Sequence, residues 1–129
     1  DRIDIHIEVT PVPFEKLSDD RKAESSVEIR KRVTNAREIQ SARFELMPTI
    51  HYNAQMSTKH IREFCALDET SKELLKNAME RLNLSARAYD RILKVARTIA
   101  DLEAAERVVS HHIAEAIQYR SLDRDGWLG

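Results

Sequence analysis

The stretch "SARAYDRILKVARTIADL", residues 85–102, decides the fold. One set of residues recurs at the spacing of a single helix face: Tyr89, Ile92, Leu93, Ala96, Ile99 and Ala100. The polar residues fall opposite and are expected in solvent: Arg87, Asp90, Arg91, Lys94, Thr98 and Asp101. Ser85 is placed to cap the helix. Two ion pairs are expected at i,i+4 spacing, Asp90 with Lys94 and Arg97 with Asp101. The stretch therefore predicts an amphipathic helix packed in a bundle.

Further helices are expected on both sides of it. Ser25 and Glu28 form a capping box before a helix over about residues 26–44, whose apolar stripe is narrow and includes Ile29, Val33 and Ala36. A stripe that narrow predicts a helix that leans on the body or projects from it. Residues 47–56 contain Pro48 and predict a loop. Three more helices are expected, capped in turn by Ser57 or Thr58, by Asp68 or Thr70, and by Ser110.

The first residues of the chain follow a different pattern. In "DRIDIHIEV" an isoleucine or valine alternates with a polar residue from Ile3 to Val9, which predicts a half-buried strand ended by Pro11 and Pro13. Nothing later in the sequence predicts a partner strand, so we expect this chain to be part of something larger. The expected division is a strand and linker at 1–13, a helical domain at 14–124 and a frayed tail at 125–129.

Composition supports a mainly helical protein and excludes few functions. The chain of 129 residues has two glycines and three prolines, and Pro48 is the single strong helix breaker between residues 14 and 125. Its 21 basic and 22 acidic residues give a net charge of −1, so no global basic field favours nucleic acid. A single cysteine, Cys65, fits a reducing compartment, and the sequence shows neither a signal peptide nor a membrane-spanning run. A cytoplasmic location is the expectation.

Two stretches, "DRIDIHIEV" and "LSARAYDRILKVARTIADL", together with "NAQM" at 53–56 and "HHIAEAIQYRSLDR" at 111–124, closely resemble one family. They resemble the magnesium-chelatase-like AAA+ ATPases, in particular the bacterial competence-associated subfamily. The resemblance covers residues 1–124 and implies a mainly α fold, the C-terminal helical lid of the ATPase preceded by one orphan strand of its core. The chain contains no phosphate-loop or Walker B motif, so by itself it is expected to be inactive towards ATP.

The resemblance also implies roles for two arginines. Arg2 matches the arginine finger that reaches the nucleotide of a neighbouring subunit. Arg87 matches the sensor 2 arginine at the start of a lid helix, which contacts the γ-phosphate of ATP. For the whole protein the resemblance implies ATP and Mg²⁺ as cofactors, a homo-oligomeric ring that is expected to be a hexamer, and DNA remodelling in competence or recombination.

Several alternatives stay open at this point. The whole protein could be the motor subunit of a magnesium chelatase, which inserts the metal into a porphyrin, or the chain could be a stand-alone helical interaction module. His111 and Glu115 could share a metal ion beside His112, but zinc needs three or four ligands and a polar first turn of a helix is favoured, so no metal site is expected. Cys65 is expected as core filler. The basic stretch around Arg30 and Arg37 could touch a nucleic-acid backbone, although a solvated face is favoured.

Overall fold

Helices make up the domain. The computed structural model describes Ile5, residues 24–120 and the backbone of residues 121–128. Within that part the elements follow in the order α2 (Ser26–Arg43), a 3₁₀ turn η1 (Asn53–Gln55), α3 (Thr58–Phe64), α4 (Glu69–Arg81), α5 (Ala86–Leu102) and α6 (Ser110–Leu128). The expectation of a mainly α fold is confirmed. The expected strand at 3–9 lies outside the described residues apart from Ile5. Residues 125–128 of the expected frayed tail are instead the last residues of α6, and residue 129 lies outside the described part.

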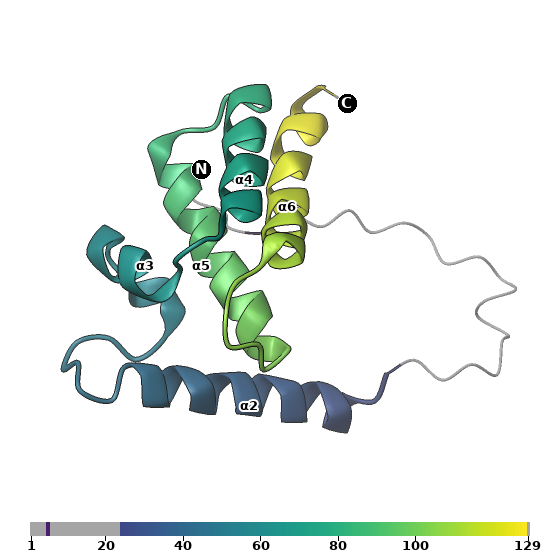
Figure 1. Cartoon of the computed structure of the whole chain (residues 1–129). Coiled ribbons are helices and arrows are strands. Elements are labelled where there is room, and N and C mark those ends of the chain that lie inside the picture. The colour runs from purple at the N-terminus through teal and green to yellow at the C-terminus, as the bar shows by residue number, and fades with distance from the viewer. Residues whose placement is uncertain (1–4, 6–23, 129) are drawn as a thin grey trace, which may run out of the picture.

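Helix α5 is the centre of the arrangement (Figure 1). It packs against α2, α3 and α6, while α4 packs against α6, and α2 lies across one end of the bundle. The apolar face expected for α5 is buried at Ile92, Leu93, Ala96 and Ala100, which meet core residues of other helices such as Leu75 and Ile113. Tyr89 was expected on this face, but its side chain is 40% exposed.

Hydrogen bonds at the helix starts explain where each helix begins. Three expected caps are confirmed, because the side chains of Ser25, Asp68 and Ser85 accept the backbone N–H three residues later, at 3.2, 2.8 and 3.2 Å. Ser57, one of the two residues expected to cap α3, is its N-cap and forms a capping box with His60, and α6 also uses a histidine at its start. Nδ1 of His60 accepts the N–H of Ser57 at 3.2 Å, and Nδ1 of His112 accepts the N–H of Val109 at 3.0 Å. The expectation that Ser110 caps α6 is wrong, since Ser110 is already helical and the imidazole of His112 satisfies the preceding amide.

Helices α4 and α5 end in the same motif without a glycine. Asn83 and Ala104 have positive φ angles of 51° and 57°. After α4 the N–H of Leu84 bonds to the carbonyl of Met79 at 3.0 Å, and after α5 the N–H of Ala105 bonds to the carbonyl of Ala100 at 2.8 Å. This is the Schellman pattern, which satisfies carbonyls that a helix end leaves open. Each reversal is therefore short, and it sends the next helix back along the bundle.

Helix α2 leans on the body, as its narrow apolar stripe predicts. Ala36 and Gln40 are its buried residues. Ile29 was expected as a core residue, yet it is 43% exposed, and Val33 is also exposed. The reason is that α2 meets the bundle through its C-terminal half and leaves the first two turns without a covering element among the described residues. In the described part of the chain, no helix has both the length and the apolar character needed to span a bilayer.

Candidate functional site

Arg87 stands in the first turn of α5, where the resemblance places the sensor 2 arginine. The side chain is exposed, and it forms no hydrogen bond or ion pair with any described residue. The hydroxyl of Ser85 accepts the amide of Ala88, which leaves the amides of Ala86 and Arg87 unbonded within the described part. A free guanidinium beside free helix-start amides is an arrangement suited to an anion.

A buried polar cluster lies at the opposite end of α5. The carboxylate of Asp101 accepts two hydrogen bonds from Arg43 of α2, at 2.8 and 2.7 Å, and an ion pair joins it to Arg97 at 3.1 Å. The Asp101 side chain is fully buried. The expected pairing of Arg97 with Asp101 is confirmed, but the expectation that Asp101 faces solvent is wrong. Arg43 of α2 covers this carboxylate and removes it from water.

Asn53 of the "NAQM" stretch completes the cluster. Its side-chain amide donates to Asp101 at 2.8 Å and to Thr98 at 3.1 Å, while its oxygen accepts from Arg43 at 3.0 Å. Its backbone N–H bonds to the side-chain oxygen of Gln40 at 2.8 Å. All these groups join α2, η1 and α5 to one another. In this domain the asparagine of "NAQM" is therefore a structural residue.

Arg97 fixes the connection that follows α5. Its guanidinium donates to the carbonyls of Ala105 and Glu106 at 2.9 and 3.3 Å. Burial lowers the pKa of Arg97, and the nearby carboxylate of Asp101 opposes that shift. An arginine keeps its charge in spite of such a shift, so the buried cluster holds two cations around one carboxylate. Two backbone carbonyls accept hydrogen bonds from Arg97, and the side chain of Asn53 bonds to Arg43 and Asp101. These contacts satisfy part of the polar atoms of the cluster.

The other expected ion pair of α5 does not form. Nζ of Lys94 donates to the carbonyl of Ala54 at 3.1 Å, and the carboxylate of Asp90 accepts from the hydroxyl of Thr58 at 3.0 Å. Each side chain thus ties α5 to a different neighbour in place of pairing along the helix. Arg91, expected in solvent on the same side, is half-buried and engaged.

Cys65 belongs to the core, as expected. It is buried beside Phe44 and Ile61 in the apolar cluster. Burial raises the pKa of its thiol to about 11, although the guanidiniums of Arg97 and Arg43 act in the other direction. A thiol with so high a pKa is protonated at neutral pH and is a poor nucleophile. The burial and the raised pKa of the thiol fit the expected place of Cys65 in the core.

His111 and His112 meet a carboxylate, but a different one from Glu115. Glu103, at the end of α5, bonds to Nε2 of His111 at 3.0 Å and to Nε2 of His112. Glu115 instead accepts from the hydroxyl of Tyr119 at 3.3 Å. These hydrogen bonds lower the pKa of Glu103, that from His111 most. Sequence reasoning missed Glu103 because it follows the last helical residue of α5, and the reversal at Ala104 then brings it over the start of α6.

Whether Glu103, His111 and His112 can hold a metal depends on which ring nitrogen of His112 carries the proton. Their ligand atoms all lie within 4.8 Å of one another, which is close enough for one ion. However, Nδ1 of His112 accepts the N–H of Val109, so the neutral ring carries its proton on Nε2, the nitrogen that faces Glu103. A metal would need the lone pair of that nitrogen, and metal-bound histidines donate from the other one. The cluster fits a hydrogen-bonded link between α5 and α6 better than a metal centre.

Two sequence-based candidates remain without a structural test. Arg2, the expected arginine finger, lies outside the described residues. The basic stretch of α2 is exposed at Arg30, Lys31 and Arg37, as a solvated face would be, and its contact with nucleic acid stays an untested alternative.

Comparison with known proteins agrees with this arrangement. A family model described as magnesium chelatase, subunit ChlI C-terminal, matches residues 23–120. Competence protein ComM of Haemophilus influenzae is 39% identical over 125 residues, which are 96% of this chain and 24% of that protein. Proteins called YifB, described as uncharacterized, from Salmonella typhimurium and Escherichia coli are each 38% identical over the same shares. The chain thus spans about a quarter of the length of these curated relatives. It belongs to the family described as magnesium chelatase, subunit ChlI C-terminal, and is the helical lid domain of a magnesium-chelatase-like protein.

Proposed function

We propose that this domain is the lid of an AAA+ ATPase, and that Arg87 binds a phosphate of ATP as its sensor 2 residue. One observation carries the proposal. Arg87 is an exposed guanidinium in the first turn of α5, without a partner among the described residues. A guanidinium is planar and permanently charged, and its donors match phosphate oxygens.

The position of Arg87 favours an anionic ligand on energetic grounds. The N-terminus of a helix is the positive end of its dipole, so a cation there is unfavourable until an anion lies beside it. Free amides at the same end add further donors to that anion. Arg43, which is partly buried, and Arg97, which is buried, differ, because a carboxylate or backbone carbonyls already occupy their donors. Among these three arginines, Arg87 is thus the one suited to contact a nucleotide.

The rest of the proposed mechanism concerns the whole protein. A core domain would bind Mg-ATP, and Arg87 would stabilise the negative charge that develops on the transferred phosphate. Arg2 would do so from a neighbouring subunit of a ring, expected to be a hexamer. A change in the position of Arg87 would then tilt α5 and carry the state of the nucleotide into the bundle.

DNA is the proposed substrate of the motor. The relative from Haemophilus influenzae is named a competence protein, and it matches 96% of this chain. Competence is the uptake of transforming DNA, so a motor of this group would remodel DNA during uptake or recombination. A second candidate is the motor of a magnesium chelatase, which the description of the matching family favours. Stimulation of ATP hydrolysis by DNA, or by a porphyrin with Mg²⁺, separates the two.

Steady-state ATP hydrolysis by the longer protein that contains this domain and its core tests the role of Arg87. Arg87→Ala is expected to lower kcat by about 100-fold or more, since an interaction made in the transition state contributes to kcat more than to nucleotide binding. The lid is expected to keep its Tm, because the side chain is exposed. Arg81→Ala is the matched control, an exposed arginine at the end of α4. Parental kcat in Arg87→Ala, or an equal loss in both variants, would contradict the assignment.

A further inference from the structure

Asp90 follows Arg87 by three residues on α5, the spacing at which an arginine and an aspartate of one helix can form an ion pair. The two side chains do not pair. The carboxylate of Asp90 accepts the hydroxyl of Thr58 at 3.0 Å, while Arg87 has no partner among the described residues. Thr58 is the first residue of α3. A side chain from a different helix thus engages the acid that could otherwise pair with Arg87.

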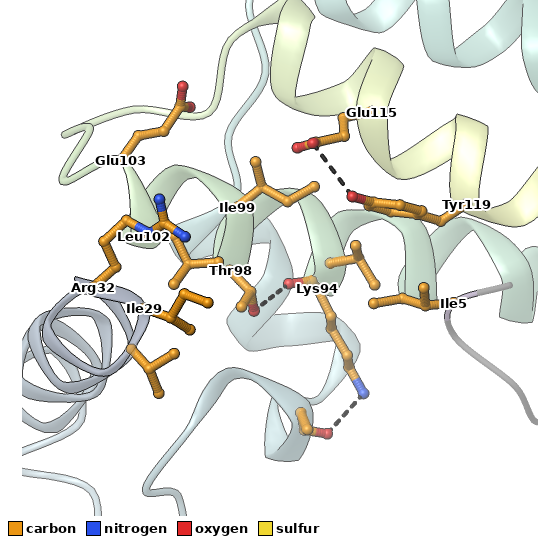
Figure 2. Close-up of a pocket in the computed structure, with 13 residues that line it drawn as sticks. Ile5, Ile29, Arg32, Lys94, Thr98, Ile99, Leu102, Glu103, Glu115 and Tyr119 are labelled. Atoms are coloured by element: carbon orange, nitrogen blue, oxygen red, sulfur yellow. Dashed lines mark hydrogen bonds between the residues drawn. The ribbon is translucent and has the colours of Figure 1, made fainter. Parts of the chain in front are cut away.

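The other cation at ion-pair spacing from Asp90 is engaged elsewhere. Lys94 follows Asp90 by four residues, and its Nζ donates to the carbonyl of Ala54 at 3.1 Å, a contact drawn as a dashed line in Figure 2. That bond ties Lys94 to η1 in place of a pair with Asp90. If the hydroxyl of Thr58 were removed, Arg87 would therefore be the one of these two cations that is available to the carboxylate.

A pair between Asp90 and Arg87 would compete with an anionic ligand. A guanidinium that donates to a carboxylate has fewer donors left for phosphate oxygens. The negative charge of that carboxylate would also repel a phosphate group beside it. Both effects would weaken a phosphate site at the start of α5. Because ion pairs between exposed side chains are weak, the loss would be a partial one.

We propose that Thr58 is a positioning residue: its hydroxyl holds the carboxylate of Asp90 against α3 and so keeps Arg87 available to an anion. Thr58 acts through Asp90 and does not itself contact the phosphate. The consequence for catalysis rests on the proposed function of Arg87, whereas the restraint on Asp90 does not. The bond also makes the site sensitive to α3, because a movement of α3 away from α5 would break it and release the carboxylate.

NMR of the arginine side chains in this 129-residue chain, without nucleotide, tests the restraint. Thr58→Val removes the hydroxyl and keeps the shape of the side chain, and it is expected to move the guanidinium resonances of Arg87 downfield as Asp90 pairs with it. Thr58→Ser keeps a hydroxyl and is the matched control, which should leave these resonances in place. Unchanged Arg87 resonances in Thr58→Val would overturn the proposal. A shift at Arg62 instead would also overturn it, since Arg62 lines the same hollow as Asp90 and would then be its partner.

Steady-state ATP hydrolysis by the longer protein that contains this domain and its core tests the consequence for Arg87. Thr58→Val is expected to lower kcat by about twofold, the scale of one ion pair at this spacing, and Thr58→Ser is expected to keep the parental kcat. In an Asp90→Asn background, Thr58→Val should have no further effect on kcat, because no charge is released. A merely structural role of Thr58 would lower kcat in both backgrounds.

The two experiments separate this proposal from the role of Arg87. Equal losses of kcat in the two backgrounds would refute the positioning role of Thr58, even if Arg87→Ala is inactive. Parental kcat in Arg87→Ala would refute the proposed function, and the NMR shift alone would then decide whether Thr58 restrains Asp90. A shift at Arg87 and a loss of kcat that both require Asp90 support the proposal.

Discussion

Arg43 and Asp101 are 58 residues apart in the sequence and form two parallel hydrogen bonds, at 2.8 and 2.7 Å. The pair joins the last turn of α2 to the last turn of α5, and the carboxylate has no contact with solvent. Because Arg97 and Asn53 bond to the same carboxylate, Asp101 is the acceptor that three separate segments share.

Removing that carboxylate should be severely destabilising. Asp101→Ala leaves the buried guanidinium of Arg97 and the partly buried one of Arg43 without their counter-ion, and breaking a buried pair in this way costs about 3–5 kcal/mol. Urea unfolding followed by circular dichroism measures the free energy of unfolding. Asp90→Ala, on the half-exposed side of the same helix, is the control and should cost about 1 kcal/mol or less. A similar loss of unfolding free energy in the two variants would show that the buried cluster contributes no more to stability than the contacts of Asp90.

Cys65 should resist alkylation in the folded protein. Burial raises the pKa of its thiol to about 11, and the side chain is 3% exposed. Iodoacetamide at pH 8 is therefore expected to modify the native chain at least ~100-fold more slowly than the chain in urea, as followed by mass spectrometry. Fast modification of the native chain would contradict the buried position.

The raised pKa of Cys65 also predicts a loss of stability in alkali. The folded thiol keeps its proton at pH values where the unfolded thiol, with an ordinary value of 9.0, has released it. Stability should then fall as the pH rises from 9.0 towards about 11. Cys65→Ala should reduce this slope, measured by urea unfolding at several pH values, whatever its effect on stability at pH 7.

The link between Glu103 and the two histidines predicts acid sensitivity. Hydrogen bonds, that from His111 first, lower the pKa of Glu103 below its ordinary value of 4.5. A lowered carboxyl pKa stabilises the fold at pH above 4.5, and this contribution disappears as the pH falls through the folded value. Glu103→Gln should flatten the dependence of Tm on pH in that acidic range. Glu106→Gln, an exposed neighbour, should leave the dependence as it is.

Zinc should not stabilise the domain. His112 presents a protonated Nε2 towards Glu103 while its Nδ1 accepts the amide of Val109, so zinc binding would cost a helix-start hydrogen bond. Equimolar Zn²⁺ is expected to change Tm by less than about 1 °C, since a ligand that does not bind the folded state does not stabilise it. A zinc-dependent rise in Tm that His112→Gln abolishes would show that the ring reorients and that the cluster is a metal site.

The sequence predicted the local features of this fold well. The apolar period of residues 85–102, the caps at Ser25, Asp68 and Ser85, and the weak attachment of α2 all depend on residues a few positions apart. The exposure of Arg87 was also predictable, because the residue lies on the face of α5 opposite the apolar residues. Tyr89 was misplaced because a helical period gives a direction but not the extent of the neighbouring helix that would cover the ring.

Features that depend on distant partners were not predictable in this way. A helical projection puts Asp101 on the polar side, and nothing near it in sequence indicates that Arg43 arrives from α2 to cover it. Glu103 reaches His112 because the chain reverses at Ala104, and alanine is an unusual residue at a positive φ. A signal for the buried cluster did exist in "NAQM", whose asparagine and glutamine suit a hydrogen-bonded turn, but it did not identify their partners.

Helix α5 can be regarded as a lever. Its 17 residues give a length of about 25 Å, with Arg87 near one end and the Asp101 cluster at the other. A tilt of about 10° about the Arg87 end would displace the far end by about 4 Å, nearly one helical turn. Arg43 bonds that far end to α2, and Arg97 bonds it to the connection into α6, so both neighbours would move with it. If Arg87 binds a phosphate as proposed, a tilt of α5 at that site would therefore also move α2 and the connection into α6.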